Sequence, residues 1–552
     1  MDENSEEPAI AAPIITAPSI SQAGVRYKWF PILWVGIPLL ISFVIDLMEG
    51  DPGVANTIRW VTLLLGLLGI TWWLFRCTHW SRKICWFCGA LPSALVAAQY
   101  AHLTPLEIKT DGAVGIVGYQ WRWQTPDREL EQLESQEATE LDWQTTPNDY
   151  PRFLGNGYWA EVSGVELETD WEANPPKLLW KEKIGAGWSS FAVVGNYAIT
   201  QEQRGDREYV VCYDIQTFQS VWSHSDPVRW DPGGAGALGY AGPRATPTIH
   251  GGKVFVQGAT GIFNCLDAKT GNVLWSHDTL KKHGSENVVW GKSCSPLVVD
   301  DMVVVSVGGK QNQSVVAYEM ATGEVRWASG EYQSSYASPV LAEIGGVRQV
   351  VSVDENYVTA RRADNGQALW EFSWPSSSGA EAAVSQPIPL SGDRLFVSKG
   401  YGVGAALFQI TNDEGDHWQL VPLWRKTVLK TKMSNVVIHD GFVYGLDDKI
   451  LQCVELETGK KKWKKRRVPE FGYGQMMLIG DTILFLSEGG EVILVEAAPE
   501  KYRELASLRA FDDDSVTWNN PVFAAPYLLV RNAEEAACYE LPINKVGASL
   551  AE

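Results

Sequence analysis

The chain has 552 residues, and its 46 basic and 66 acidic side chains give a formal net charge of −20 at pH 7. Nucleic-acid binding requires a basic footprint, so this composition excludes it for the chain as a whole. One local exception is the basic run GKKKWKKRR at residues 459–467. This run is either a solvated outer strand or a contact for anionic lipid or another polyanion.

The N-terminal hundred residues predict a membrane anchor that contacts lipid. Residues 1–25 lack hydrophobic periodicity and are predicted to be disordered. Trp29–Leu47 is an apolar run of 19 residues, about 28 Å long as a helix, which is enough to cross a bilayer core. Thr57–Phe75 is a second such run, and both carry tryptophan at their edges. Residues 26–103 are therefore expected to form two or three transmembrane helices.

A weaker third stretch, Ile84–His102, decides on which side of the membrane the rest of the chain lies. The positive-inside rule puts the basic residues before the first run and after the second in the cytoplasm. With two spans the C-terminal part is cytoplasmic, and with three it is periplasmic. The basic hairpin between the second and third runs favours three. We therefore expect an integral membrane protein with its large domain on the periplasmic side.

Residues 104–176 are predicted to link the anchor to the large domain. LEIKTDGAVGIVGYQWRW at 106–123 is typical of a short β segment. Residues 127–142 are strongly acidic and predict a spacer helix or a disordered linker.

A tryptophan then recurs behind one short phrase, as in AKTGNVLW, ATGEVRW and ETGKKKW. Intervals of 39 to 54 residues are the signature of a β-propeller or another stacked repeat. Copies with the phrase end at Trp222, Trp275, Trp327, Trp370 and Trp463, and two further copies, at Trp180 and Trp424, keep the tryptophan without the phrase.

Each repeat reads as four short strands bounded by Gly, Asp and Asn, which is the pattern of one propeller blade. Eight first strands can be counted, from residues 189–201 to residues 519–532. The last unit has only three strands, whereas an orphan strand at 176–185 precedes the first. We therefore predict an all-β fold: an eight-bladed propeller of four-stranded antiparallel blades over residues 177–545. The early strand closes the last blade, and 546–552 form a C-terminal tail.

The recurring tryptophans are interpreted first as structural, since an indole stacked between blades buries a large apolar area. Cys212, Cys265, Cys453 and Cys538 share one repeat position, which indicates a small buried side chain rather than disulfides. Cys85 and Cys88 form a CxxC without a second pair, so no zinc site is expected.

The phrase CLDAKTGNVLW at 265–275 resembles the repeat of pyrroloquinoline-quinone (PQQ) enzymes. The whole layout is similar to that of membrane-anchored PQQ-like β-propeller proteins of planctomycete bacteria. More distantly, it resembles the quinoprotein dehydrogenases and the outer-membrane-assembly scaffold lipoprotein. The resemblance implies two classes of function: PQQ- and calcium-dependent oxidation of alcohols or sugars, or a non-catalytic scaffold. The sequence departs from the enzymes because it has no adjacent cysteines, no CxxCH motif and no compact acidic cluster for calcium.

Candidate site residues lie where inner strands begin, near the propeller axis. Basic residues there could bind the carboxylates of an anionic ligand such as PQQ. Tryptophans could stack on a planar ring, and carboxylates could act as a base or a metal ligand. The alternative is that they are ordinary polar residues of a wet channel. The candidates are Glu202, Arg244, Trp290, Lys292, Glu381, Lys432, Asn435 and Trp518.

The leading functional prediction is a non-catalytic platform that binds protein partners, with no catalytic residue assigned and no certain cofactor or metal. The alternatives are a PQQ- and calcium-dependent dehydrogenase and a sensor of a small anion. A base, a tryptophan floor and an oxygen cage that converge on the axis would favour the enzyme. An axis plugged by apolar side chains would favour the platform.

Overall fold

The computed structural model describes residues 106–110, 116–121, 130, 133, 143–157, 159–231, 240–375, 382–413, 417–511 and 516–546. The chain divides into two compact units, Met1–Thr104 and Pro105–Glu552. All described residues belong to the second unit.

The structure contradicts the predicted membrane location. A transmembrane helix needs about 20 predominantly apolar residues. Among the described residues no helix is long and apolar enough to cross a membrane, and α6 (Thr279–His283) has five residues. The prediction of an integral membrane protein with a periplasmic propeller is therefore wrong on this finding. The segments that carried it, at 29–47, 57–75 and 84–102, lie outside the described residues.

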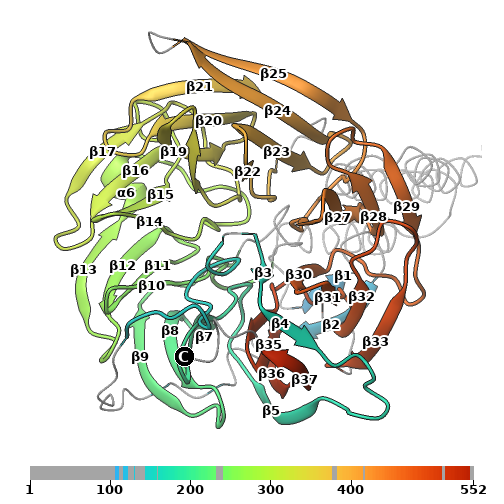
Figure 1. The fold of residues 1–552 in the computed structure, drawn as a ribbon. Coiled ribbons are helices and arrows are strands. Elements are labelled where there is room, and N and C mark those ends of the chain that lie inside the picture. Colours follow the sequence, from blue (N-terminus) through green and yellow to red (C-terminus); the bar gives the residue numbers. More distant parts are fainter. Residues whose placement is uncertain are drawn as a thin grey trace, which may run out of the picture. The chain divides into compact units, whose positions relative to one another are not determined.

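The predicted eight-bladed propeller is confirmed. Figure 1 shows the sheets arranged in chain order around a common centre, each with its first strand innermost. Blades 1 to 4 consist of β6 (Ala192–Val194), β7 (Tyr197–Arg204), β8 (Arg207–Asp214), β9 (Ser220–Asp226); β10 (Thr248–His250), β11 (Lys253–Gln257), β12 (Ile262–Asp267), β13 (Val273–Asp278); β14 (Leu297–Val299), β15 (Met302–Ser306), β16 (Val315–Glu319), β17 (Val325–Ser329); and β18 (Val340–Ile344), β19 (Val347–Val353), β20 (Tyr357–Arg362), β21 (Ala368–Ser373).

The remaining blades follow the same antiparallel order, and the last is completed by β5 (Lys177–Lys183), as predicted. Blades 5 to 8 consist of β22 (Ile388–Leu390), β23 (Arg394–Lys399), β24 (Gly404–Asp413), β25 (His417–Lys426); β26 (Val437–His439), β27 (Phe442–Asp447), β28 (Ile450–Glu455), β29 (Lys461–Lys465); β30 (Gln475–Ile479), β31 (Thr482–Leu486), β32 (Glu491–Glu496), β33 (Glu504–Arg509); and β34 (Val522–Ala524), β35 (Tyr527–Arg531), β36 (Glu535–Glu540), β5.

Three further pairings involve strands outside this plan. The hairpin β1 (Leu106–Thr110) and β2 (Ile116–Trp121) forms where the sequence predicted a β segment. β3 (Glu161–Val162) adds a fifth strand to blade 7, parallel to β30. β4 (Val165–Leu167) pairs with β37 (Ile543–Val546), so the segment before the first blade also contacts the end of the chain.

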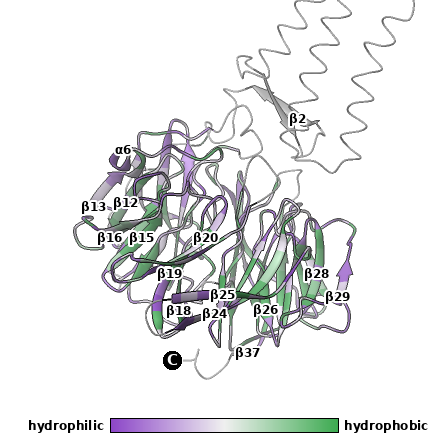
Figure 2. Ribbon diagram, turned by 90° about the horizontal axis from the view of Figure 1, so that it is seen from above, coloured by the Kyte–Doolittle hydropathy of each residue, from purple (hydrophilic) through white to green (hydrophobic). Residues whose placement is uncertain are grey.

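The middle strands of the blades carry the core. β15 and β28 are almost wholly buried, whereas β25 and β29 are largely exposed outer strands. Figure 2 shows the same contrast between hydrophobic middle strands, such as β15 and β28, and the hydrophilic outer strand β29. This pattern is expected when flat sheets stack face to face around an axis.

The repeated phrase joins each blade to its neighbour. The Trp222 indole in blade 1 donates a hydrogen bond to the Ala268 carbonyl in the turn of blade 2, at 2.9 Å. In that turn the Asp267 carboxylate accepts hydrogen bonds from Thr270. Gly271 has a φ of 70°, and a Cβ there would lie 2.5 Å from the Trp222 ring. The Asp, the Gly and the preceding blade's Trp are therefore parts of one contact.

The same contact recurs around most of the ring. Indole donors reach the next blade's turn carbonyl at Ile215, Met320, Ala363, Leu456 and Ala498. Turn glycines that face the preceding tryptophan are Gly323, Gly366 and Gly459. Trp370 differs, since its indole donates to the Gln349 side chain.

The interblade contact gives a testable stability difference between two glycines. Gly271→Ala and Gly251→Ala both place a side chain at positive φ, which costs about 1–2 kcal/mol. Only Gly271 faces a tryptophan, because nothing lies within 4 Å of a Cβ at Gly251. We expect Gly271→Ala to lose about 1–3 kcal/mol more than Gly251→Ala in chemical unfolding, the usual range for overpacking. Equal losses in the two variants would contradict the proposed contact between the turn glycine and the tryptophan of the preceding blade.

Candidate functional site

The inner strands begin with a belt of hydrogen bonds between blades. Each has a polar residue at its start or two positions before it, and several of these side chains accept the amide proton of the preceding blade's equivalent residue. These bonds run from the amide of Ser190 to Thr246 (3.1 Å), of Thr246 to Ser295 (2.9 Å), of Ser295 to Ser338 (2.8 Å) and of Gln386 to Asn435 (2.8 Å). Ser190 also donates to the Asn520 carbonyl at 2.6 Å, which joins blade 1 to blade 8.

The segment 149–167, which we call the plug, crosses the centre of the ring. Tyr150 exchanges two backbone hydrogen bonds with Val193 in β6, at 3.0 and 2.7 Å. The Pro151 carbonyl accepts from Ile249 in β10 at 2.8 Å. On the opposite side, β3 pairs with β30, and the Ala160 carbonyl accepts from Leu478 at 2.7 Å. The plug thus bonds to the inner strands of blades 1, 2 and 7.

Apolar side chains of the plug complete the contact. Tyr150, Leu154, Ala160, Val165 and Leu167 are at most 4% exposed and belong to the core cluster shared by blades 1, 7 and 8. Trp159 packs against the cluster between blades 5 and 6. The sequence prediction had assigned these residues to the linker, whereas the structure makes them part of the propeller core.

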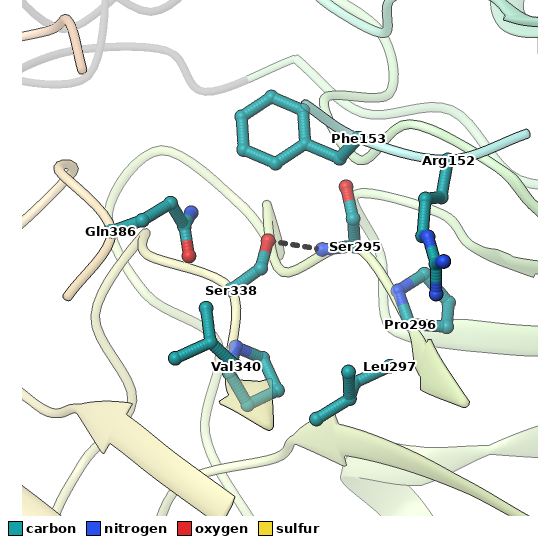
Figure 3. Close-up of a pocket in the computed structure, with 9 residues that line it drawn as sticks. Arg152, Phe153, Ser295, Pro296, Leu297, Ser338, Val340 and Gln386 are labelled. Carbon is teal, nitrogen blue, oxygen red and sulfur yellow. Dashed lines mark hydrogen bonds between the residues drawn. The ribbon is translucent and has the colours of Figure 1, made fainter. Parts of the chain in front are cut away.

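A small pocket remains between the plug and blades 3 to 5. It is lined by Arg152 and Phe153 of the plug and by Ser295, Ser338 and Gln386 at the starts of the inner strands. Figure 3 shows the Phe153 ring facing this group, with the Ser295–Ser338 hydrogen bond beneath it. The space suits about one water molecule, and both polar atoms of the buried Gln386 amide lack a protein partner. A planar cofactor does not fit in this pocket.

Glu202 is fully buried and its carboxylate is engaged on both oxygens. Oε1 accepts from Arg204 Nε at 2.6 Å and from the Tyr213 hydroxyl at 3.1 Å. Oε2 accepts from the Gly185 amide at 3.1 Å. Nearby, the buried Arg531 donates to the Gly185 carbonyl at 2.9 Å and to Thr200 Oγ1, also at 2.9 Å. Glu202 therefore lies in the seam where blade 8 meets blade 1.

Lys292 and Asn435 are also held by the framework. Lys292 is 1% exposed, and its ammonium donates to the Val307 carbonyl and to Ser334 Oγ. Burial lowers the pKa of Lys292 to about 8. Asn435 is a belt residue whose Oδ1 accepts from the Gln386 amide. Both predicted residues thus bind neighbouring blades. Glu381 lies outside the described residues.

The other predicted residues lie among aromatic rings on the loops that lead into inner strands. Trp518 packs on Trp188 at 5.0 Å between ring centroids, and Trp188 contacts Tyr240 at 5.5 Å. Arg244 donates to the Tyr240 carbonyl at 2.7 Å, which brings it next to this group. The Trp518 indole donates to Glu488 at 2.7 Å. Arg244 and Trp518 therefore share one aromatic cluster.

Trp290 and Lys432 have aromatic neighbours of their own. Trp290 lies 5.1 Å from the Tyr336 ring, between centroids. The Lys432 ammonium lies 5.1 Å from the Tyr401 ring and 5.0 Å from the Tyr473 ring. Cation–π contacts of this kind help to hold a half-buried cation in place.

One carboxyl that the sequence reasoning missed is Glu208 on β8. It is 5% exposed, and its Oε1 has no hydrogen-bond partner. Burial raises its pKa from 4.5 to about 8, although the nearby Arg244 opposes the shift. Burial in turn lowers the pKa of Arg244, and Glu208 opposes that shift. No sequence signal distinguishes Glu208, because a Glu at a strand start usually lies in solvent.

These residues do not fit a PQQ–calcium site. The only described carboxylate among the candidates, Glu202, is closed off by Arg204, Tyr213 and Gly185. In the part of the chain that the structure describes, no three His, Cys, Asp or Glu side chains gather in a metal-binding group. A calcium ion wants six to eight converging oxygens.

The two buried carboxyls give opposite predictions for the same substitution. Glu202→Gln removes the charge that pairs with the buried Arg204, and breaking a buried pair in this way costs about 3–5 kcal/mol. Glu208→Gln replaces a carboxyl whose raised pKa keeps it largely protonated at pH 7, so we expect no loss there. Chemical unfolding at pH 7 checks both variants, and a neutral Glu202→Gln would contradict the structural role.

Unfolding measured over a series of pH values tests in which direction Glu208 changes the stability. A raised folded-state pKa gives stability that is complete below 4.5 and is lost as the pH rises to about 8. Relative to the wild type, Glu208→Gln should therefore gain stability over this window, by at most about 1.4 kcal/mol per pH unit. A gain toward low pH would contradict the assignment.

The family model that matches the chain is described as outer membrane protein assembly factor BamB and covers residues 206–465. The chain is 25% identical over 168 residues to the protein of that name from Burkholderia pseudomallei (strain K96243), covering 29% of this chain and 40% of that protein. It is 32% identical over 91 residues to methanol dehydrogenase (cytochrome c) subunit 1 of Paracoccus denitrificans, covering 16% and 13%. The chain thus spans less than half the length of these curated relatives.

Two solved structures are similar in fold. BamB from Moraxella catarrhalis matches with a TM-score of 0.48 and 14% identity, over 66% of this chain and 100% of that one. Quinohemoprotein alcohol dehydrogenase ADHIIG from Pseudomonas putida HK5 matches with a TM-score of 0.48 and 14% identity, over 72% and 80%. Residues 206–465 thus carry repeats similar to those of the PQQ-like family that is described as assembly factor BamB.

Proposed function

We propose that this protein is a non-catalytic binding platform whose propeller presents its faces and edges to protein partners. The observation that carries the proposal is the plug. Residues 149–167 cross the centre of the ring and bond to the inner strands β6, β10 and β30. An axis filled by the protein's own backbone and apolar side chains supports a role for the outer surfaces.

The candidate residues that already form hydrogen bonds within the propeller support the same conclusion. A general base must reach the proton that it abstracts, whereas the Glu202 carboxylate is buried among Arg204, Tyr213 and Gly185. Lys292 and Asn435 join neighbouring blades. The similarity to assembly factors over residues 206–465 points to protein binding as well.

The second candidate function is a PQQ-dependent dehydrogenase, and two observations favour it. One is the 32% identity to a methanol dehydrogenase subunit over 91 residues. The other is the aromatic cluster around Arg244, since a guanidinium beside tryptophan rings suits a planar anionic ligand. A dehydrogenase must bind PQQ near the axis, whereas a platform need not, so a direct binding measurement separates the two functions.

The test is a titration of the full chain with PQQ, with and without calcium, followed by tryptophan fluorescence. The platform predicts no saturable, calcium-dependent quenching and no reduction of an artificial electron acceptor with simple alcohols or sugars. Arg244→Gln is the matched control for non-specific quenching, because it removes the only guanidinium of the described aromatic cluster. Saturable quenching that Arg244→Gln abolishes, together with turnover, would replace the platform with the dehydrogenase.

A further inference from the structure

The outer strand of blade 6, β29 (Lys461–Lys465), differs from the other blade edges in its charge. It is the last strand of the sheet β26-β27-β28-β29, and among the described strands it pairs with β28 alone. One side of its backbone is therefore an open sheet edge. Four of its five residues are exposed lysines, and only Trp463 is partly buried.

The surrounding run 459–467 has seven basic residues in a chain whose net charge is −20. Some of these cations serve the propeller itself. Lys464 pairs with Asp447 at 2.5 Å, and Arg467 pairs with Glu491 at 2.7 Å and Glu504 at 2.8 Å. These ion pairs fix the C-terminal end of the basic strip, called here the β29 edge (residues 460–465), against blades 6 and 7.

The other lysines of the β29 edge are not neutralised. Lys460 and Lys461 are exposed and form no ion pair with any described residue. Lys462 lies over the Phe442 ring at 5.6 Å, and Lys465 lies over the Tyr502 ring at 5.8 Å. Aromatic faces hold these two side chains without removing their charge. The edge therefore presents four positive charges along an open backbone.

Protection against aggregation does not explain this placement. Lysines on edge strands commonly prevent pairing between copies. Among the described outer strands, those that expose large apolar side chains are β5, β13, β17 and β25, through Leu178, Val273, Leu274, Val325, Val421 and Leu423. The lysine run stands instead on β29, which is hydrophilic along its length (Figure 2) and exposes no large apolar side chain.

We infer that the β29 edge binds an extended acidic polypeptide segment of a partner protein by strand addition. The open backbone supplies main-chain hydrogen bonds, as in other cases of β-augmentation. The lysines pair with carboxylates of the added strand and repel basic ones, which gives selectivity and a faster encounter. The inference rests on the proposed platform function and names the chemistry of one partner surface.

The experiment measures binding of a fluorescent peptide of about ten residues, alternating Glu and Val, to the full chain by anisotropy. A second peptide has the same charges but N-methylated alternate amides, which block strand addition. We expect the first peptide to bind, more weakly as salt rises from about 50 to 500 mM, and the methylated peptide to lose at least about tenfold in affinity.

Charge reversal locates the site. Lys460→Glu/Lys461→Glu should weaken peptide binding by at least about tenfold. Lys269→Glu/Lys281→Glu makes the same change in net charge at exposed positions of blade 2 and its helix, and should stay within about twofold. Lys460→Gln/Lys461→Gln, with an intermediate effect, guards against misfolding of the first variant.

Several results would overturn the inference. They are no binding of either peptide, equal binding of the methylated peptide, or equal losses in both reversal variants. Binding of phosphatidylglycerol vesicles through the same lysines, without peptide binding, would replace the acidic strand with a lipid surface. None of these outcomes depends on PQQ, so a failure here leaves the platform standing if the PQQ titration is negative.

Discussion

Everything else in this propeller depends on how its axis is filled. Eight sheets that stack face to face diverge from a common centre, and their innermost strands leave a space that their own side chains do not close. The protein closes it with two devices. A belt of polar residues links the starts of neighbouring inner strands, and the plug, 149–167, bonds to three inner strands and packs against others.

Closing the ring also requires that charged side chains buried between blades 8 and 1 find partners there. Blade 8 is built from both ends of the domain, so its seam with blade 1 joins residues far apart in the chain. Arg531 bonds to the Gln201 carbonyl, 330 residues away, and to Gly185. Glu202 then neutralises Arg204 in the same seam. Charged residues near the axis of such a propeller are thus explained by closure before any ligand is invoked.

Much of the fold was predictable because the repeat encodes a contact between blades. The Asp caps its turn, the Gly leaves space for an indole, and the Trp of the preceding blade fills that space, as in Asp267, Gly271 and Trp222. All three therefore recur together, and the strand count and the closing strand at 177–183 follow from them. The membrane location was predicted from apolar runs, their flanking tryptophans and the placement of basic residues, and it is contradicted by the absence of a spanning helix among the described residues.

The candidate site was less predictable, for physical reasons. The sequence of the plug is not part of the repeat, and its position depends on pairing with inner strands that come later in the chain, such as β30. Glu202 accepts hydrogen bonds from Gly185 and Tyr213, and Lys292 donates one to Ser334, so much of what buries them lies outside their own segments and gives no local signal. Belt positions such as Asn435 were found, because the start of an inner strand is a fixed place in the repeat.

The most direct test of the account is hydrogen exchange of the amides that join the plug to the ring. The relevant donors are Tyr150, Val193, Ile249 and Leu478. If the plug is part of the core, Tyr150 should exchange as slowly as the inner-strand amides, through unfolding of the propeller rather than local opening. Rapid exchange of Tyr150, with Ile249 and Leu478 unprotected, would show an open axis and contradict the account.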